Sequence, residues 1–365
     1  MALRVFNIFK HLDWLMLLPV VLLSILGLSE LYSMDVGQSG RLFEKQLTVL
    51  LLGLVMVAVV IWLDYYFWYS FGVYFYFLSL LLLAIVLLFG STINNTKGWF
   101  EFGFGNFQPV ELAKVSLIII LARYFSKANP VRQPFRTLCL SALLALGPII
   151  LVMFQPDLGS AAILGSIWLL LLILAGWPRK FVIILASIAI FTSVFSWPLL
   201  AAYQKDRIVG VFLNRSGSLT SNYNVNQAII AVGSGQSLGR GLGYGSQSQL
   251  RFLPEAKNDF IFAVIAEELG FLGVMAVISC FVLIFWRIIA NLPKIKDNFG
   301  IFFLLGFGVL IFLQMFINIG MNLGLLPVVG ITLPFLSYGG SSLSVNLLLF
   351  GIAQSIIARS KLKNY

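Results

Sequence analysis

The chain has 365 residues, of which 60% are hydrophobic and only 10% are charged, and its formal net charge is +10. Soluble domains carry about 25% charged residues, so a single water-excluding core cannot account for so much apolar sequence, and lipid must solvate most of it. The composition excludes a soluble domain, and because the basic residues lie mainly between apolar runs, the positive charge indicates membrane orientation and no nucleic-acid partner.

Apolar runs recur along the whole chain, and a spanning helix needs about 20 mostly apolar residues. The first run, residues 13–33, is long enough to span and is followed by others, so no cleavable signal peptide is evident. We therefore predict an all-α polytopic membrane protein with one domain over residues 1–365. Its ten predicted transmembrane helices are residues 13–33, 46–63, 67–90, 109–125, 136–154, 158–176, 180–201, 260–290, 299–325 and 339–358.

Ten spans place both chain termini on the same side of the membrane, and the distribution of Lys and Arg selects the side. With a cytoplasmic N-terminus, the inner segments hold 14 of the 24 basic residues, the outer segments hold nine, and Lys114 lies within a span. Six of the nine outer charges fall in one long loop, which the rule discounts. The sequence therefore predicts that both termini are cytoplasmic.

One long polar segment, about residues 202–258, separates the seventh and eighth spans and is predicted to face outward. Its apolar stretch at 226–232 predicts a short helix at the membrane interface. The stretch 233–245 is dense in glycine, and two interpretations stay open: a flexible linker, or a loop whose backbone N–H groups and basic neighbours bind an anion. It lacks the Walker pattern of a nucleotide-binding loop.

Ionisable residues within or beside spans are costly and are functional candidates by default. Glu111 and Lys114 are one helical turn apart, so they are predicted to face each other. They form either a structural ion pair or the polar wall of a cavity in which Lys114 meets a substrate phosphate. Asp157 follows Pro156 in a short outer turn, and it is either the N-cap of the next helix or a functional carboxylate.

Three further carboxylates lie where the long polar segment meets the eighth span. Asp259 fits an N-cap, and it also fits a general base that takes a proton from an alcohol. Glu267 and Glu268 lie about two turns deeper. At 100° per residue, Glu267 falls near the face of Asp259 and Glu268 on the opposite side. At least one of the two must then pair with another helix, and structural pairing is favoured for both.

Five ordered motifs make the chain similar to the SEDS family (shape, elongation, division and sporulation), the RodA, FtsW and SpoVE proteins. The signature is Phe252-Leu-Pro-Glu255 with Asp259-Phe-Ile-Phe-Ala-Val264 and Glu267-Glu-Leu-Gly270. The other four motifs lie at 108–114, 155–160, 223–241 and 318–342, and all five follow the family's order over nearly the whole chain.

The resemblance implies a ten-helix peptidoglycan glycosyltransferase that polymerises lipid II, the undecaprenyl-diphosphate-linked disaccharide-pentapeptide, at the outer face of the bacterial cytoplasmic membrane. It implies a class B penicillin-binding protein as partner, and it places the family's catalytic aspartate on Asp259. The short tails and residues 245–250 favour RodA, the elongation member, over FtsW. The predicted substrate-binding residues, which carry the motifs or supply cations beside them, are Trp99, Glu111, Lys114, Gln155, Asp157, Arg207, Gln227, Arg240, Lys257, Ser337 and Ser341.

The implied reaction starts from an α-linked donor and gives a β-1,4 linkage, so one inverting displacement is enough. Asp259 would act as general base on the acceptor 4-hydroxyl. The diphosphate leaving group needs positive charge, and the available cations are Lys114, Arg207, Arg240 and Lys257. Mg²⁺ suits diphosphate and carboxylate oxygens, but the chemistry does not require it, and no metal-binding residue is assigned.

Two other functions remain open. Topology and buried charges alone favour a transporter, so a lipid II flippase is the main alternative, and a structural membrane scaffold for the penicillin-binding protein is the third. Cys139 and Cys280 lie in apolar runs and are predicted to be small core residues. His11 is the only histidine, which excludes Ser-His-Asp catalysis and a His-rich metal site.

Overall fold

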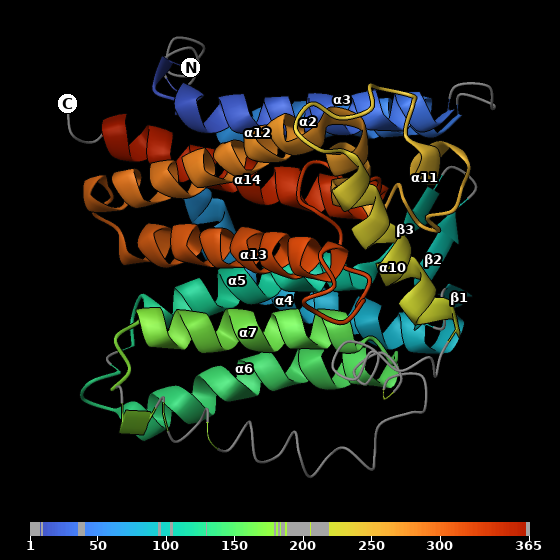
Figure 1. The fold of residues 1–365 in the computed structure, drawn as a ribbon. Helices are drawn as coiled ribbons and strands as arrows, with labels where there is room; N and C mark the ends of the chain where they lie inside the picture. The colour runs from blue at the N-terminus through green and yellow to red at the C-terminus, as the bar shows by residue number, and fades with distance from the viewer. Residues whose placement is uncertain are drawn as a thin grey trace.

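Long helices form the body of the molecule in the computed structural model, which describes residues 10–35, 41–93, 96–102, 105–128, 130–178 and 219–362 and a few isolated positions. Helices joined by short turns run in opposite directions (Figure 1). The long helices are α2 (Trp14–Asp35), α3 (Arg41–Trp62), α4 (Tyr65–Phe89), α5 (Pro109–Phe125), α6 (Pro134–Phe154), α7 (Leu158–Leu174), α12 (Ile261–Asn291), α13 (Asn298–Asn322) and α14 (Gly340–Leu362).

Nine of the ten predicted spans coincide with these helices, with ends that differ by a few residues. The remaining span, 180–201, lies almost wholly outside the described residues. Within the described ranges, seven helices are long and apolar enough to cross a membrane. α5 and α7 have only 17 residues each, about 26 Å at 1.5 Å per residue, which is slightly less than the hydrocarbon thickness of about 30 Å.

α5 is enclosed by other helices of the bundle. Of its 17 residues, 14 are buried, and it packs against α4, α13, α7, α6 and α14. A helix surrounded by protein on all sides need not match the bilayer thickness, because its ends meet other protein segments and not lipid headgroups. This position also explains how Glu111 and Lys114 are tolerated in a membrane helix.

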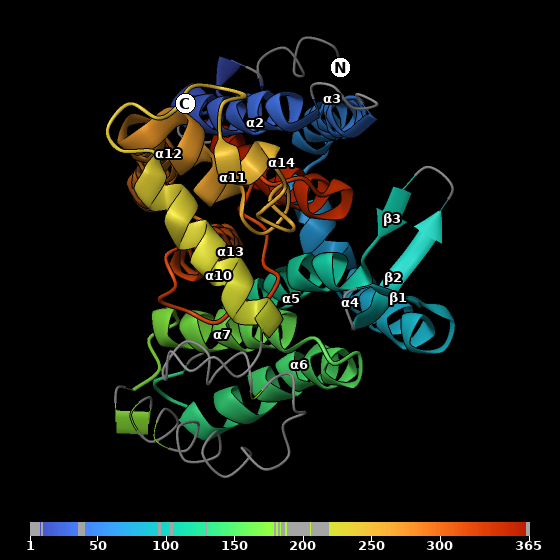
Figure 2. The same cartoon turned by 45° about the vertical axis from the view of Figure 1, so that its right-hand side comes forward.

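A small antiparallel sheet between α4 and α5 was not predicted. Its strands are β1 (Ser91–Ile93), β2 (Thr96–Phe102) and β3 (Gly105–Phe107), in the order β1-β2-β3. The sheet contacts α4, α5 and α14. It lies outside the helical bundle, so the all-α description holds for the membrane-spanning part and fails for this connection (Figure 2).

The long polar segment folds in part into two helices, α10 (Leu219–Ser234) and α11 (Ser246–Gln249). The short helix predicted at 226–232 is part of α10. This helix packs mainly on α12 and also touches α13, and it runs obliquely across the bundle (Figure 2). The described ends of the chain lie at one end of the bundle, and α11 and the sheet lie at the other (Figure 1).

The end of the bundle that carries the chain termini is held by a buried polar cluster around Asp13. Arg287 and Asn291 of α12 donate to its carboxylate. Gln354 of α14 accepts from the Asp13 amide and donates to its carbonyl. Burial by itself would raise the pKa of Asp13, but the hydrogen bonds from Arg287 and Asn291 and the Arg287 charge outweigh it and hold the pKa below its usual value.

This cluster predicts a pH-dependent stability. A depressed carboxylate pKa contributes stability that is present above the unfolded value, near 3.8, and that is lost as the pH falls through the lower folded value. Asp13→Asn should therefore lower the free energy of unfolding by roughly 3 kcal/mol at pH 7, because it leaves Arg287 unpaired. Thermal unfolding in detergent should show that the difference in stability between the wild type and Asp13→Asn shrinks below pH 4. A difference that stays constant down to pH 2 would contradict the prediction.

The α13–α14 loop (residues 323–339) threads between several helices at the other end of the bundle. An added Cβ at Gly27 of α2 would lie 2.2 Å from the Leu336 carbonyl oxygen, and one at Gly159 of α7 would lie 2.5 Å from the Val329 carbonyl oxygen. These distances are too short for any side chain, so the loop backbone can approach α2 and α7 this closely only because these positions are glycine. The loop therefore brings α2 and α7 into contact with one central segment.

Candidate active site

The structure brings most of the predicted site residues to one end of the bundle. The turns β3–α5, α6–α7 and α13–α14 and the start of α12 all lie at the end opposite the chain termini (Figure 1). Those turns, with the sheet, α10 and the Gly-rich segment, carry the predicted residues in the described ranges. Arg207 is outside the described residues.

Asp259 is half-buried in the turn that precedes α12, and it is not the N-cap of that helix. The N-cap is Phe260, and no side chain caps the helix there. The Asp259 carbonyl accepts hydrogen bonds from the side-chain amides of Asn318 and Asn322, both at 3.0 Å. Its Oδ2 lies 3.8 Å from the position of a Cβ added to Gly330. The carboxylate therefore faces the α13–α14 loop, outside the helix.

Lys257, the predicted neighbouring cation, is held against the same loop. Its carbonyl accepts from the Tyr338 amide at 2.9 Å, and its Nζ lies 5.5 Å from the centre of the Tyr338 ring. Such a cation–π contact is worth about 0.5–1 kcal/mol at an exposed site. Lys257 thus supplies positive charge two residues from Asp259.

Glu111 and Lys114 form the predicted ion pair, at 2.8 Å between Oε1 and Nζ. Both side chains are almost fully buried, and the second oxygen of Glu111 has no hydrogen-bond partner among the described residues. The structural interpretation of the pair is therefore supported by geometry. A contact of Lys114 with a substrate phosphate stays a prediction.

The α6–α7 turn carries Gln155 and Asp157 in structural positions. Asp157 is the N-cap of α7, and its Oδ1 accepts from the Ser160 amide at 2.9 Å. Gln155 is buried, and its Nε2 donates to the Leu83 carbonyl of α4 at 3.3 Å. The capping interpretation of Asp157 is confirmed, and its contact with substrate stays a prediction.

The two predicted serines fasten the start of α14. Ser341 accepts from the Gln108 amide at 3.2 Å and donates to the Asn106 carbonyl at 3.0 Å, so it joins α14 to β3 and α5. Ser337 accepts from the Leu333 amide at 2.8 Å within the α13–α14 loop. Trp99 lies half-buried in β2. These three residues therefore have structural contacts, and no described contact tests their binding to substrate.

The Gly-rich stretch is not a flexible linker, because it is docked on a break in α12. Its binding of an external anion stays a prediction. Gly270, at φ +65° and ψ −161°, interrupts that helix. The amides of Arg240 and Gly241 donate to the carbonyls of Glu267 and Glu268, at 3.0 and 2.9 Å. Across the break, the Phe271 amide donates to the Gln236 carbonyl at 2.9 Å. The loop thus satisfies backbone groups that the interruption leaves unpaired.

The Gly-rich stretch and α11, which follows it, donate hydrogen bonds to the side chains of Glu267 and Glu268. Glu267 accepts from the Gln247 and Ser248 amides at 2.9 and 3.2 Å. Glu268 accepts from the Gly243 amide and the Ser33 hydroxyl, both at 2.8 Å, and from Ser248 Oγ at 3.1 Å. Structural pairing of both carboxylates, including pairing with another helix, is confirmed. Both side chains reach Ser248, and their predicted faces relative to Asp259 are not tested, because Asp259 lies outside the helix.

Glu30 of α2 was missed by the sequence analysis. It is fully buried beside Glu268, and the carboxyl of Glu268 is the polar group that its side chain faces. The rule that singles out ionisable residues within spans applies to it equally, but its place near the end of the first span concealed it. Two carboxyl groups side by side at this depth are costly to bury as charges.

We expect replacement by Gln to have different effects on stability at Glu268 and at Glu30. Glu268→Gln should lower the free energy of unfolding by about 1.5–3 kcal/mol, because its donors lose a charged acceptor. Glu30→Gln should leave the free energy of unfolding unchanged or raise it slightly, because it keeps the size of the side chain and removes an ionisable group from a buried position. Thermal unfolding of both variants in the same detergent measures the difference. Equal losses in the two variants would show that the hydrogen bonds to Glu268 do not decide stability here.

Two remaining predicted residues lie on the polar surface near this region. Arg240 is exposed, and its guanidinium donates to Ser246 Oγ at 3.1 Å. Gln227 is half-buried on α10. Within the described ranges, no three His, Cys, Asp or Glu side chains are gathered in a way that could hold a metal ion.

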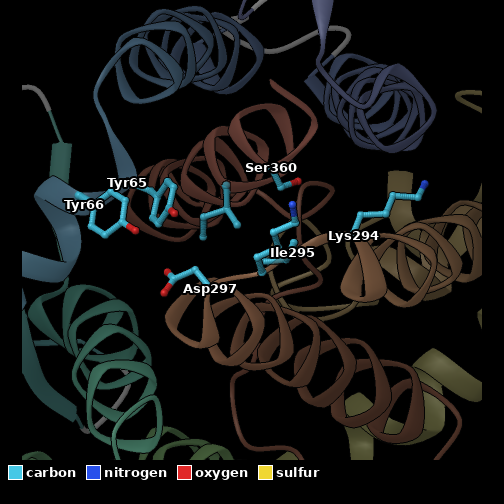
Figure 3. A pocket seen from close by; sticks show the side chains of 8 residues that line it. Tyr65, Tyr66, Lys294, Ile295, Asp297 and Ser360 are labelled. Carbon is cyan, nitrogen blue, oxygen red and sulfur yellow. The ribbon is translucent and has the colours of Figure 1, made fainter. Parts of the chain in front are cut away.

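A cavity of about 240 Å³ lies at the opposite end of the bundle, between the starts of α4 and α13 and the end of α14. Tyr65, Tyr66 and Asp297 line one side of it, and the Lys294 ammonium points away from them (Figure 3). This cavity is separated from Asp259 by the length of α13, so it is not the site that the sequence motifs predict.

The sequence model of one protein family, described as "Cell cycle protein" and named for FtsW, RodA and SpoVE, matches residues 8–362. The chain belongs to this family. It is similar to the peptidoglycan glycosyltransferase MrdB of Escherichia coli (strain K12), with 33% identity over 353 residues that cover 96% of this chain and 95% of MrdB. It is also similar to a probable peptidoglycan glycosyltransferase FtsW of Nitrosomonas europaea, with 35% identity over 372 residues, covering 97% and 94%.

Two solved structures have the same fold. A chain of a peptidoglycan synthase complex, solved in work on the coordination of polymerization and crosslinking, matches with a TM-score of 0.83 and 29% identity, covering 96% of this chain and 98% of that one. RodA of Thermus thermophilus matches with a TM-score of 0.72 and 28% identity, covering 95% and 96%. The family resemblance and the multi-pass helical fold predicted from the sequence are confirmed.

Proposed function

We propose that this inner-membrane protein is a peptidoglycan glycosyltransferase that polymerises lipid II into glycan strands. Similarity to named glycosyltransferases over nearly the whole chain supports this activity. The observation that carries the site assignment is the placement of Asp259: its carboxylate lies outside α12, at the end opposite the chain termini, and faces the α13–α14 loop. The positive-inside count supports placing that end outside the cell, with both termini cytoplasmic.

Asp259 acts in this proposal as general base on the acceptor 4-hydroxyl. The acceptor oxygen attacks the anomeric carbon of the α-linked donor as its proton passes to the Asp259 carboxylate. The new β-1,4 bond forms while the bond from the anomeric carbon to the diphosphate oxygen breaks, and undecaprenyl diphosphate leaves with the bonding electrons. One inverting step completes the transfer without a covalent enzyme intermediate.

The leaving diphosphate requires positive charge. Lys257 is the described cation closest to Asp259 along the chain, and Arg240 lies on the neighbouring docked loop. Arg207 is assigned the same role from the sequence, outside the described residues. Lys114 is less suited to this task, because its charge is already paired with Glu111 at 2.8 Å in a buried position. The remaining predicted substrate contacts serve sugar and peptide recognition in this proposal.

The proposed partner is a class B penicillin-binding protein, which would cross-link the peptides of the new strand. A match to a chain of a peptidoglycan synthase complex supports a partner of this kind. The similarity to MrdB and to RodA supports a role in elongation and cell shape.

The test is polymerisation of lipid II by the purified full chain, with and without its partner, followed by separation of the glycan products. A polymerase lengthens lipid II in detergent, where no membrane compartment exists. A flippase would leave lipid II monomeric and would move labelled lipid II across proteoliposomes. A scaffold would do neither. Monomeric lipid II after incubation with the active complex would overturn the proposed function.

A further inference from the structure

The first turn of α12 is opened beside Asp259. A regular α-helix would pair the Asp259 carbonyl with the amide of Ala263, four residues on. Instead, the Ala263 amide donates to Oδ1 of Asn322 at 3.1 Å, and Nδ2 of Asn322 donates to the Asp259 carbonyl at 3.0 Å. The side-chain amide of Asn322 is thus inserted between the two backbone groups, and Asp259 stays outside the helix.

Asn318, one turn earlier on α13, makes a second bridge. Its Nδ2 donates to the Asp259 carbonyl at 3.0 Å and to the Ile331 carbonyl at 2.7 Å. Ile331 follows Gly330, the residue that the Asp259 carboxylate faces. Asn318 therefore joins, through one amide group, the backbone of Asp259 and the backbone of the loop opposite its carboxylate.

The two amides form a closed and buried network. Both side chains are 0% exposed. An Asn side chain has two N–H donors, and Asn322 uses its second donor on the Asn318 carbonyl at 2.8 Å, so all four donors of the pair have acceptors. A fully satisfied buried network of this kind specifies one arrangement, because any displacement leaves a polar group unpaired.

The backbone on the other side of Asp259 is also fixed to the loop. The Tyr338 amide donates to the Lys257 carbonyl at 2.9 Å. The α13–α14 loop therefore holds the chain two residues before Asp259, and the two asparagines hold it at Asp259 itself. None of these contacts uses the carboxylate.

We infer that Asn318 and Asn322 are positioning residues, which hold Asp259 by its main-chain carbonyl and keep its carboxylate outside α12, over Gly330. The inference rests on the proposed function, in which Asp259 is the general base. Without Asn322, the Asp259 carbonyl and the Ala263 amide would pair directly and draw Asp259 into the first turn of the helix. A shift of about 1 Å in a catalytic group costs on the order of 100-fold in rate, and such a rearrangement moves the whole residue.

The test is the kinetics of lipid II polymerisation by Asn322→Ala, using the full chain with its partner. We expect kcat per folded molecule to fall by about 10- to 100-fold. The KM for lipid II should stay within about twofold, because neither amide contacts substrate in this proposal. Asn318→Ala provides a second variant with the same expected pattern if Asn322→Ala does not fold.

Gln314→Ala is the matched control. Gln314 lies on α13 one turn before Asn318, it is 0% exposed, and its amide has no hydrogen-bond partner among the described residues. Its truncation opens a cavity in the same helix without touching Asp259, so it should keep the wild-type kcat even if the unfolding temperature falls. A kcat of Asn322→Ala equal to that of Gln314→Ala would overturn the inference.

Asp259→Asn separates failure of the inference from failure of the proposed function. If Asp259→Asn makes no glycan and both asparagine variants keep the wild-type kcat, the positioning role is wrong and the base assignment stands. If Asp259→Asn polymerises lipid II at the wild-type rate, the base assignment fails, and the positioning role fails with it.

Discussion

Replacing Asp259 with Asn is expected to stop glycan synthesis while leaving the fold intact. The substitution keeps the size of the side chain and removes its ability to take the proton of the acceptor hydroxyl. General base catalysis contributes about 100- to 10,000-fold in rate, so the loss should be at least about 100-fold. Stability should change little, because Asn318 and Asn322 bind the main-chain carbonyl of residue 259, which the substitution retains.

The measurement is the initial rate of lipid II polymerisation at saturating substrate, with the unfolding temperature recorded in the same detergent. Asp297→Asn is the matched control, since Asp297 is the N-cap of α13 at the opposite end of the bundle. Asn caps helices as well as Asp, so this variant should keep both rate and stability. A polymerisation rate for Asp259→Asn within a few-fold of wild type would refute the general-base role.

Replacing Gly235 with Ala is expected to give the largest loss of stability among single-methyl changes in the long polar segment. An added Cβ at Gly235 would lie 1.7 Å from the Ala266 carbonyl oxygen, a backbone atom of α12, the helix on which the loop is docked. Backbone cannot yield as a flexible side chain does, so the docked loop must separate from the helix. We expect the free energy of unfolding to fall by about 3 kcal/mol or more.

The same change two residues earlier provides the control. Gly233 is exposed near the end of α10, and an added Cβ there meets no atom within 4 Å. Gly233→Ala should therefore keep stability or raise it by up to about 1 kcal/mol, because Ala favours helix over Gly. Thermal unfolding of the two variants in one detergent measures the contrast. Similar stabilities would mean that the loop does not dock on α12 as described.

Loss of docking should also reduce polymerisation. The docked loop binds the carbonyls of Glu267 and Glu268 on the α12 segment that begins two residues after Asp259. That segment is buried from Ile261 to Glu268, with no lipid contact of its own. Its position depends on the segments that surround it, so a displaced loop would move the start of α12 and Asp259 with it.

The membrane spans could be predicted from the sequence because hydropathy is a local property. A run of about 20 apolar residues in a bilayer has no lower-energy form than a helix, since every backbone group must pair within the segment. Nine predicted spans accordingly match helices in the described ranges. The same local logic gave the Glu111–Lys114 contact and the cap at Asp157, because both depend on residues within one turn of helix.

The sheet and the docked loop could not be predicted, because both depend on partners distant in sequence. β1 to β3 carry no strong alternation of polar and apolar residues, and the strands are 3, 7 and 3 residues long. The glycines of the loop suggested flexibility, yet Gly239 and Gly270 serve close backbone contact at φ +79° and +65°. Those contacts are needed only because α12 is broken at Gly270, and no local sequence pattern predicts this break.

The placement of Asp259 shows the same division between local pattern and tertiary contact. The sequence by itself determined the class of protein, the family motifs and the aspartate at the start of the eighth span. It did not determine that Phe260 is the cap, or that Asp259 is held outside the helix by amides some 60 residues further along the chain. Hydropathy and motif spacing follow from neighbouring residues, whereas the position of this carboxylate follows from packing α13 and its loop against α12.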